Sequence, residues 1–337
     1  MPLESKSSRT ISILLIGNLS MFFAEVFSGA SLLWLLSPWA ILVTFPLYLS
    51  HLLLFVNLAY RTGRNSIRSL YLWGVIFGFY EFWITKVLWS GFNGEPMFGS
   101  FYGIAVGELF LLAFFWHPVM SFLAPIVAFR IFECSLDGEE SCREDELIVK
   151  TRWRIVFLVY IALNGGVILA FNSGFNIFIS TITSAISLAI IYGLVRICRR
   201  RNIKISMRDL YLGRKGMLLL VVYLAFLYLV AFYGIYPERI PPVHTIILTF
   251  LLYLAILLLI YLDKKPPRAS NHGEILHVDD FNRVIKIFVV LQIVMCLIPP
   301  VCFVMMVTII LMDIILAITL LSKTIYDILV SLREVME

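Results

Sequence analysis

Charged residues are scarce in this sequence, and their scarcity sets the class of protein. Only 15% of the 337 residues are charged, whereas soluble domains carry about 25%. Hydrophobic residues make up 61% of the chain, and the mean hydropathy is +0.93. These values exclude an ordinary soluble domain and predict an all-α, polytopic integral membrane helical bundle with no soluble domain. The lipid bilayer is therefore the expected partner, and nucleic acid is not.

Recognisable catalytic and metal-binding motifs are also missing. The five cysteines form no CxxC pair, and the chain has no HExxH, GxSxG, GxxxxGK[ST] or Rossmann glycine pattern. His272, His277, Asp279 and Asp280 have the side chains of metal ligands, but their Pro- and Asn-containing segment is typical of a hydrated loop. We therefore expect no metal and no cofactor.

Apolar blocks long enough to cross a bilayer recur along the whole chain. They predict about ten spans in a single transmembrane domain over 1–337: 11–28, 38–60, 67–90, 100–132, 153–171, 175–197, 215–236, 243–262, 283–298 and 301–322. The first block resembles a signal peptide but is followed soon by another span, which favours a retained helix.

Lys and Arg alternate between successive connections. They occur near the amino terminus and in 61–68, 130–154, 196–215, 264–286 and 323–333. The connections 28–37, 91–99 and 172–174 and the turn at 299–300 have none, and the turn 237–242 has only Arg239. The positive-inside rule then predicts a cell-membrane protein with both termini in the cytoplasm.

The fourth block, 100–132, is too long for one straight helix and too short for two helices with a loop. Because Lys and Arg alternate between successive connections, this block must cross the membrane an odd number of times. We predict one long helix kinked near His117-Pro118 or Pro125, and the alternative is a re-entrant piece followed by a crossing.

The third block carries small and polar residues on one helical stripe. Gly74, Gly78, Glu81 and Thr85 follow one another at three- and four-residue spacing. Glycines at this spacing let helices approach closely in lipid, so we expect a neighbouring helix to pack against this face. A carboxyl group inside a span needs a partner or a function, which makes Glu81 the first candidate for a site.

Glu108 follows a second glycine series, at positions 99, 103 and 107, at the start of the fourth block. From the helical rise, Glu81 and Glu108 both lie roughly 13 Å below the outer surface. Two carboxyl groups at one depth on adjacent helices are able to share a proton, because like charges at close range favour one protonated form.

Other polar residues extend the series of candidates. Lys86 and Glu25 lie near the outer ends of their spans, where they can pair, although for Lys86 we favour an extended side chain that reaches the interface. Deeper candidates for ion, proton or substrate binding are Asn164, where Gly165 and Gly166 are expected to loosen the helix, and Asp313, His51 and His117. Residues 1–132 hold most of these groups, so we predict a polar site half there and an apolar scaffold half over 153–322.

Three functions fit these features. The first is a transporter-like protein with a proton- or cation-linked carboxylate site that handles a small ion or lipid. The second is an intramembrane enzyme that acts on a lipid or polyprenyl substrate, with Glu81 or Glu108 as general acid or base and His117 or His51 assisting. The third is a non-catalytic membrane scaffold. The carboxylates within the spans place the first ahead of the other two.

Overall fold

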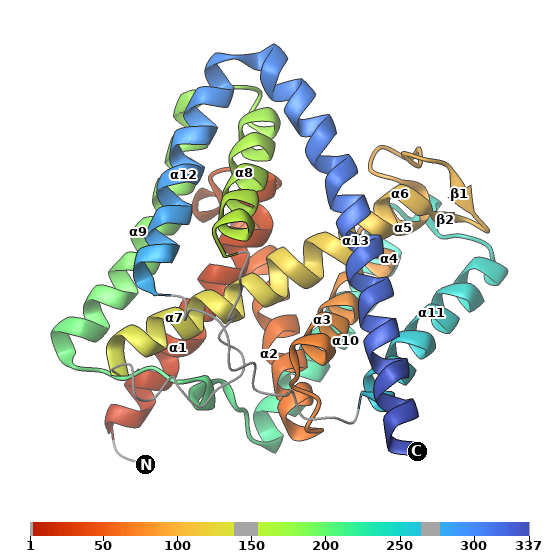
Figure 1. Ribbon diagram of the computed structural model, residues 1–337, viewed down its shortest axis with the longest axis horizontal. Helices are drawn as coiled ribbons and strands as arrows, with labels where there is room; N and C mark the ends of the chain where they lie inside the picture. The colour runs from red at the N-terminus through yellow and green to blue at the C-terminus, as the bar shows by residue number, and fades with distance from the viewer. Residues whose placement is uncertain (1–2, 138–153, 264–276, 337) are drawn as a thin grey trace. The chain divides into compact units, whose positions relative to one another are not determined.

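A computed structural model describes residues 3–137, 154–263 and 277–336. The chain forms two compact units, which are considered separately below. Nearly every element in the described residues is a helix, as the composition predicts, and the α-helices and strands are labelled in Figure 1. Three helices belong partly to each unit: α2 (Phe45–Arg61), α13 (Pro299–Met336) and the helix Val106–Leu136, which passes from unit 2 to unit 1 after Leu123.

Unit 1 comprises Met1–Leu49, Ala124–Tyr211 and Pro267–Ile309. Its elements are α1 (Leu3–Met21), η1 (Phe22–Val26), η2 (Trp34–Leu36), η3 (Ala40–Thr44), α7 (Ala124–Asp137), α8 (Arg154–Asn172), α9 (Ile177–Arg201), η6 (Met207–Leu210) and α12 (Val278–Leu297). Two of them, η1 and η3, are π-helical turns.

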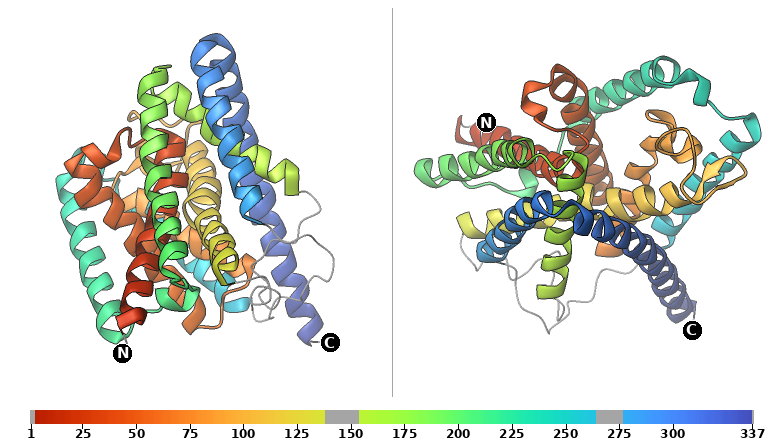
Figure 2. Two further views of the ribbon diagram at one scale, coloured as in Figure 1. Left: turned by 90° about the vertical axis from the view of Figure 1, so that its left-hand side faces the viewer. Right: turned by 90° about the horizontal axis from the view of Figure 1, so that it is seen from above.

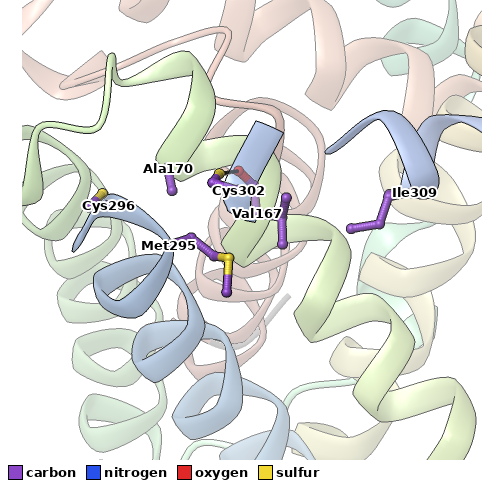
Figure 3. Packing of buried hydrophobic residues seen from close by; sticks show 6 residues of the cluster. All are labelled: Val167, Ala170, Met295, Cys296, Cys302 and Ile309. Carbon is purple, nitrogen blue, oxygen red and sulfur yellow. Dashed lines mark hydrogen bonds between the residues drawn. The ribbon is translucent and has the colours of Figure 1, made fainter. Parts of the chain in front are cut away.

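In unit 1, α8 packs closely along α12, and Figure 2 shows the two helices side by side. Gly166 allows this approach, because a Cβ atom there would lie 2.7 Å from the Cβ of Leu291. Near one end of the pair, Val167, Ala170, Met295, Cys296, Cys302 and Ile309 form a buried apolar cluster (Figure 3). The helix α8 continues through Asn164, Gly165 and Gly166 without interruption, so the expected loosening is wrong: the glycines serve packing instead.

Unit 2 comprises Ser50–Leu123, Leu212–Pro266 and Ile310–Glu337. Its elements are α3 (Ile67–Gly78), α4 (Tyr80–Trp83), α5 (Val87–Ser90), β1 (Ser100–Phe101), β2 (Ile104–Ala105), α6 (Val106–Glu108), η4 (Leu109–Leu123), α10 (Arg214–Gly234), η7 (Pro237–Arg239) and α11 (Val243–Leu262). The strands β1 and β2 pair as a small antiparallel hairpin in the loop before α6 (Figures 1 and 2).

Seven of the predicted spans coincide with helices in the described residues that are long and apolar enough to cross a membrane. These are Lys6–Val26, Ala40–Arg61, Val106–Leu136, Ile177–Arg201, Arg214–Gly234, Val243–Leu262 and Pro299–Glu334. The predicted spans 153–171 and 283–298 correspond to α8 and α12, which are helical but fall outside that set. These helices support a multi-pass membrane protein.

The predicted third span is not one continuous helix. It is broken into α3, α4 and α5, with a bend at Phe79 and a left-handed residue at Lys86 (φ 60°). An apolar run alone could not reveal the break, because the hydrogen bonds that stabilise it are made with other helices. This discontinuous segment, residues 67–90, carries the principal candidate site.

The predicted fourth span begins later than expected and then runs as one helix, Val106–Leu136. Residues 100–105 form the hairpin instead, because Gly99 and Gly103 both adopt φ values of 78° and cannot continue a helix. Around Pro118 the helix widens into a long π-helical stretch, η4. The structure thus has one distorted helix here, whose irregular stretch includes His117-Pro118. The kink itself stays a prediction.

Candidate functional site

The discontinuous segment places Glu81 against His117 of η4. The Oε1 atom of Glu81 lies 3.1 Å from Nε2 of His117. Both residues are buried, with exposed fractions of 8% for Glu81 and 2% for His117. A carboxyl group and an imidazole at this distance can pass a proton between them, which is the basic chemistry that the pair offers.

The glycine stripe of α3 explains how the pair comes together. A Cβ atom on Gly74 would lie 2.6 Å from the Cα of Pro118, and one on Gly78 would lie 3.0 Å from the Cβ of His117. Only glycine permits η4 to approach this closely, which confirms the close packing that the spacing predicts. One turn further along, Glu81 then faces His117.

A tyrosine hydroxyl group joins α3 to the distorted helix η4 near its proline. Pro118 has no N–H group, which interrupts the helical hydrogen bonds around it. The hydroxyl group of Tyr71 on α3 donates to the carbonyl of Phe114 at 2.7 Å. The distortion of η4 and its packing on α3 are thus stabilised by the same residue.

The bend between α3 and α4 is held from α11. The hydroxyl group of Tyr253 donates to the carbonyl of Phe79 at 3.1 Å and accepts from the indole N–H of Trp83 at 3.0 Å. A non-helical backbone within a membrane segment requires partners of this kind, because no water is available to it.

Further hydrogen bonds orient both members of the pair. The hydroxyl group of Thr85 donates to the second carboxyl oxygen of Glu81, and Nδ1 of His117 lies 3.1 Å from the hydroxyl group of Ser121. Ser121 follows His117 by one helical turn, and Thr85 follows Glu81 by the same spacing. Each titratable group therefore has a local hydroxyl partner as well as the other member of the pair.

His51, on α2, lies on the other side of the aromatic residues that cover His117. Its ring stacks on Phe77 at 5.1 Å, and its Nε2 atom lies 2.9 Å from the hydroxyl group of Tyr228. The ring of Tyr80 contacts both imidazoles, with centroid distances of 5.6 Å to His51 and 5.0 Å to His117. Two histidines thus flank one tyrosine in unit 2.

Lys86 does not extend to an interface. Its side chain is fully buried, and Nζ donates to the carbonyls of Ala231 at 3.2 Å and of Ile235 at the end of α10. The expectation of an extended side chain is therefore wrong, because the carbonyls that end α10 provide acceptors within the protein.

The structure gives Glu108 a partner of a different kind from that of Glu81. Its carboxyl oxygens lie 3.0 and 3.3 Å from the backbone N–H of Met97, so Glu108 fixes the loop before the hairpin. In unit 1, Glu25 accepts from the hydroxyl groups of Tyr48, at 2.6 Å, and of Ser31. The idea that Glu81 and Glu108 share a proton stays a prediction.

Two of the sequence candidates are buried on long helices. Asn164 lies on α8 in unit 1, and Asp313 lies on α13 in unit 2, each with no exposed surface.

Sequence reasoning missed a further buried carboxylate in unit 2, Asp263. Asp263, at the end of α11, lies 2.9 Å from Nη2 of Arg68 and accepts from the hydroxyl groups of Ser66, at 2.7 Å, and of Ser69. Ser66 is also the N-cap of α3, where its side chain accepts from the N–H of Ser69 at 3.0 Å. The Ser-x-x-Ser spacing before an apolar run indicates a helix start, but not the partner.

A polar stripe on α9 was also missed. The indole N–H of Trp34 donates to Ser187 at 2.8 Å, and the amide of Gln292 donates to Ser184 at 3.0 Å. This stripe lies in the half that the sequence predicts to be an apolar scaffold, and Tyr228 and Tyr253 come from that half too. The division into site and scaffold halves stays a prediction.

Among residues 3–137, 154–263 and 277–336, no group of three or more His, Cys, Asp or Glu side chains is arranged to hold a metal ion. Asp280 accepts from the backbone N–H of His277 at 2.7 Å and so caps α12. His272 lies outside the described residues.

Comparisons with known proteins agree with the membrane class. The model of an uncharacterized membrane protein family matches residues 14–334. An uncharacterized protein of Archaeoglobus fulgidus is 43% identical over 114 residues, which cover 34% of this chain. The match covers 36% of that relative, so the chain spans about a third of the length of the curated relative that it matches. No solved structure matches the chain. Since the family match extends over most of its length, the protein belongs to this uncharacterized membrane protein family and is a multi-pass member with several apolar helices.

Proposed function

We propose that this protein is a transporter-like membrane protein in which Glu81 and His117 form a proton-linked site. The observation that carries the proposal is the buried hydrogen bond of 3.1 Å between Glu81 and His117. Ionisable side chains inside membrane segments mark proton relays and ion or substrate pathways by default.

The discontinuous segment supports transport over a purely structural role. Transporters commonly place their sites where membrane helices are interrupted, because the interruption frees polar backbone groups and allows movement. Glu81 lies on α4, between the bend at Phe79 and the left-handed turn at Lys86. A scaffold that only packed against other proteins would have no need for a titratable pair at such a break.

The orientation and the cellular location form part of the proposal. We place both termini in the cytoplasm and the protein in the cell membrane, because the Lys and Arg distribution favours this arrangement.

The test is proton flux in proteoliposomes that contain a pH-sensitive dye. A potassium diffusion potential, set with valinomycin, drives protons inward, and dye fluorescence reports their entry. Wild-type protein should give flux above that of protein-free vesicles. Glu81→Gln should abolish it, and His117→Gln should slow it by about tenfold or more, since the exchange partner is lost.

Glu95→Gln serves as the matched control, because Glu95 is exposed in the loop between α5 and β1. Its flux should equal that of the wild type. Glu108→Gln separates the two carboxylates that the sequence places at one depth: retained flux assigns the site to Glu81 alone. Wild-type flux no greater than that of empty vesicles, or unchanged flux in Glu81→Gln, would refute the proposal.

A second candidate rests on the same distance. A carboxyl group within hydrogen-bond reach of an imidazole also fits general acid–base catalysis on a lipid or polyprenyl substrate. This reading predicts turnover in detergent, without any gradient. Mass spectrometry of lipid extracts incubated with wild-type protein and with Glu81→Gln distinguishes the two, since a transporter leaves the lipids chemically unchanged.

A further inference from the structure

The buried ammonium group of Lys86 is bound by groups other than the Glu81–His117 pair. Lys86 lies between α4 and α5 in a left-handed conformation, φ 60°, that few lysines adopt. Its Nζ atom donates to the carbonyls of Ala231 and Ile235 and lies 5.5 Å from the ring centroid of Phe232. Three groups that attract cations thus surround one ammonium.

The end of α10 has the chemistry of a cation site. The carbonyl of Ile235 lies just beyond the last turn, whereas that of Ala231 also accepts from the backbone N–H of Ile235 at 2.9 Å. The helix dipole gives this end a partial negative charge. An aromatic face adds attraction for an ammonium group. In transporters, the C-terminal ends of interrupted helices commonly coordinate the coupling cation. Here the chain supplies the cation itself.

We propose that Lys86 acts as a tethered cation, whose ammonium group fills a carbonyl-and-aromatic site for primary ammonium at the C-terminal end of α10. By filling this site, Lys86 holds α4 and α5 against α10 without a free ion. Because Glu81 lies on α4, the same contact fixes the position of its carboxyl group. For transport, the inference rests on the proposed function. Because Lys86 already fills this cation site, the proton carried by the Glu81–His117 pair is the coupling ion.

The test removes the tether and returns the cation in solution. In Lys86→Ala, the three side-chain carbons beyond Cβ are lost together with the ammonium group. Propylammonium, which has the same three carbons and the same charged group, replaces them. Thermal unfolding in detergent is followed by tryptophan fluorescence, to which Trp73, Trp83 and Trp89 of unit 2 contribute. We expect Lys86→Ala to lower Tm by about 5 °C, because charged hydrogen bonds are lost.

Propylammonium should raise the Tm of Lys86→Ala with increasing concentration, as mass action requires, and should leave the wild type unchanged. Tetramethylammonium carries the same charge but has no N–H group, and it should have no effect. Lack of rescue by propylammonium in folded Lys86→Ala, or equal rescue by both ions, would overturn the proposal.

A second variant decides the matter if Lys86→Ala does not fold. Lys86→Met keeps the volume and loses the charge, and Lys215→Met makes the same change at an exposed position of α10. A lower Tm in the first and not in the second supports the tethered cation, and a wild-type Tm in both refutes it. These readouts need no flux, so failure here is distinct from failure of the proton-linked site.

Discussion

The contact between Gly74 and η4 yields a prediction whose magnitude follows from the geometry. In Gly74→Ala, the new Cβ would lie 2.6 Å from the Cα of Pro118 and 3.1 Å from its Cβ. Carbon atoms pack at about 3.5 Å or more, so η4 must move away from α3 by about 1 Å. The obstacle is backbone rather than the end of a flexible side chain, and a change of rotamer cannot relieve it.

Two opposing effects set the free energy of unfolding in this variant. Overpacking costs about 1–3 kcal/mol, and a clash with backbone belongs near the upper end of that range. The replacement of glycine by alanine inside a helix contributes about 1 kcal/mol in the opposite direction. We therefore expect Gly74→Ala to be destabilised by about 2 kcal/mol.

The same displacement should weaken the site. His117 adjoins Pro118, and its hydrogen bond to Glu81 measures 3.1 Å. A movement of about 1 Å lengthens this contact to about 4 Å, which exceeds the range of a hydrogen bond. Proton flux in Gly74→Ala should therefore fall toward that of His117→Gln, although no titratable group has been changed.

Gly193→Ala is the matched control, because a Cβ atom at this position of α9 would meet nothing within 4 Å. Only the gain in helix propensity remains, so Tm should rise by about 3 °C, whereas Gly74→Ala should lose about 5 °C. Unfolding monitored by tryptophan fluorescence measures both. The reasoning fails if the two substitutions shift Tm in the same direction, or if Gly74→Ala leaves flux intact.

Two further predictions concern polar contacts that stabilise unit 2. Tyr71→Phe removes the hydroxyl group that donates to a carbonyl of η4 and should cost about 1–2 kcal/mol, whereas Tyr233→Phe, at an exposed tyrosine, should cost nothing measurable by the same assay. Equal stability of the two variants would show that the η4 carbonyl needs no donor. Asp263→Asn leaves Arg68 without its ionic partner and should lower stability by about 3 kcal/mol, whereas Asp279→Asn, at an exposed aspartate, should have no effect. A wild-type Tm for Asp263→Asn would contradict a structural role for the ion pair.

The sequence by itself determined the class of protein and one packing contact. Scarcity of charge and long apolar runs require helices that satisfy their own backbone groups in lipid, so seven of the predicted spans coincide with apolar helices. The Gly74–Gly78 stripe predicts a close neighbour, because small residues at this spacing form a groove whatever lies opposite. Glu81 stood out for a similar reason: a carboxyl group inside a span must be stabilised by some partner.

Only the tertiary structure decided what those groups contact. That Glu81 faces His117 depends on the register of α3 and α4 against η4, and hydrophobic periodicity does not encode this register. The break at Lys86 is likewise a property of two helices, since the carbonyls that bind its ammonium belong to α10. The apolar pattern of a single helix is enough to show which of its faces is buried. Which polar groups pair depends on which helix surfaces meet, and those surfaces meet only when the helices pack.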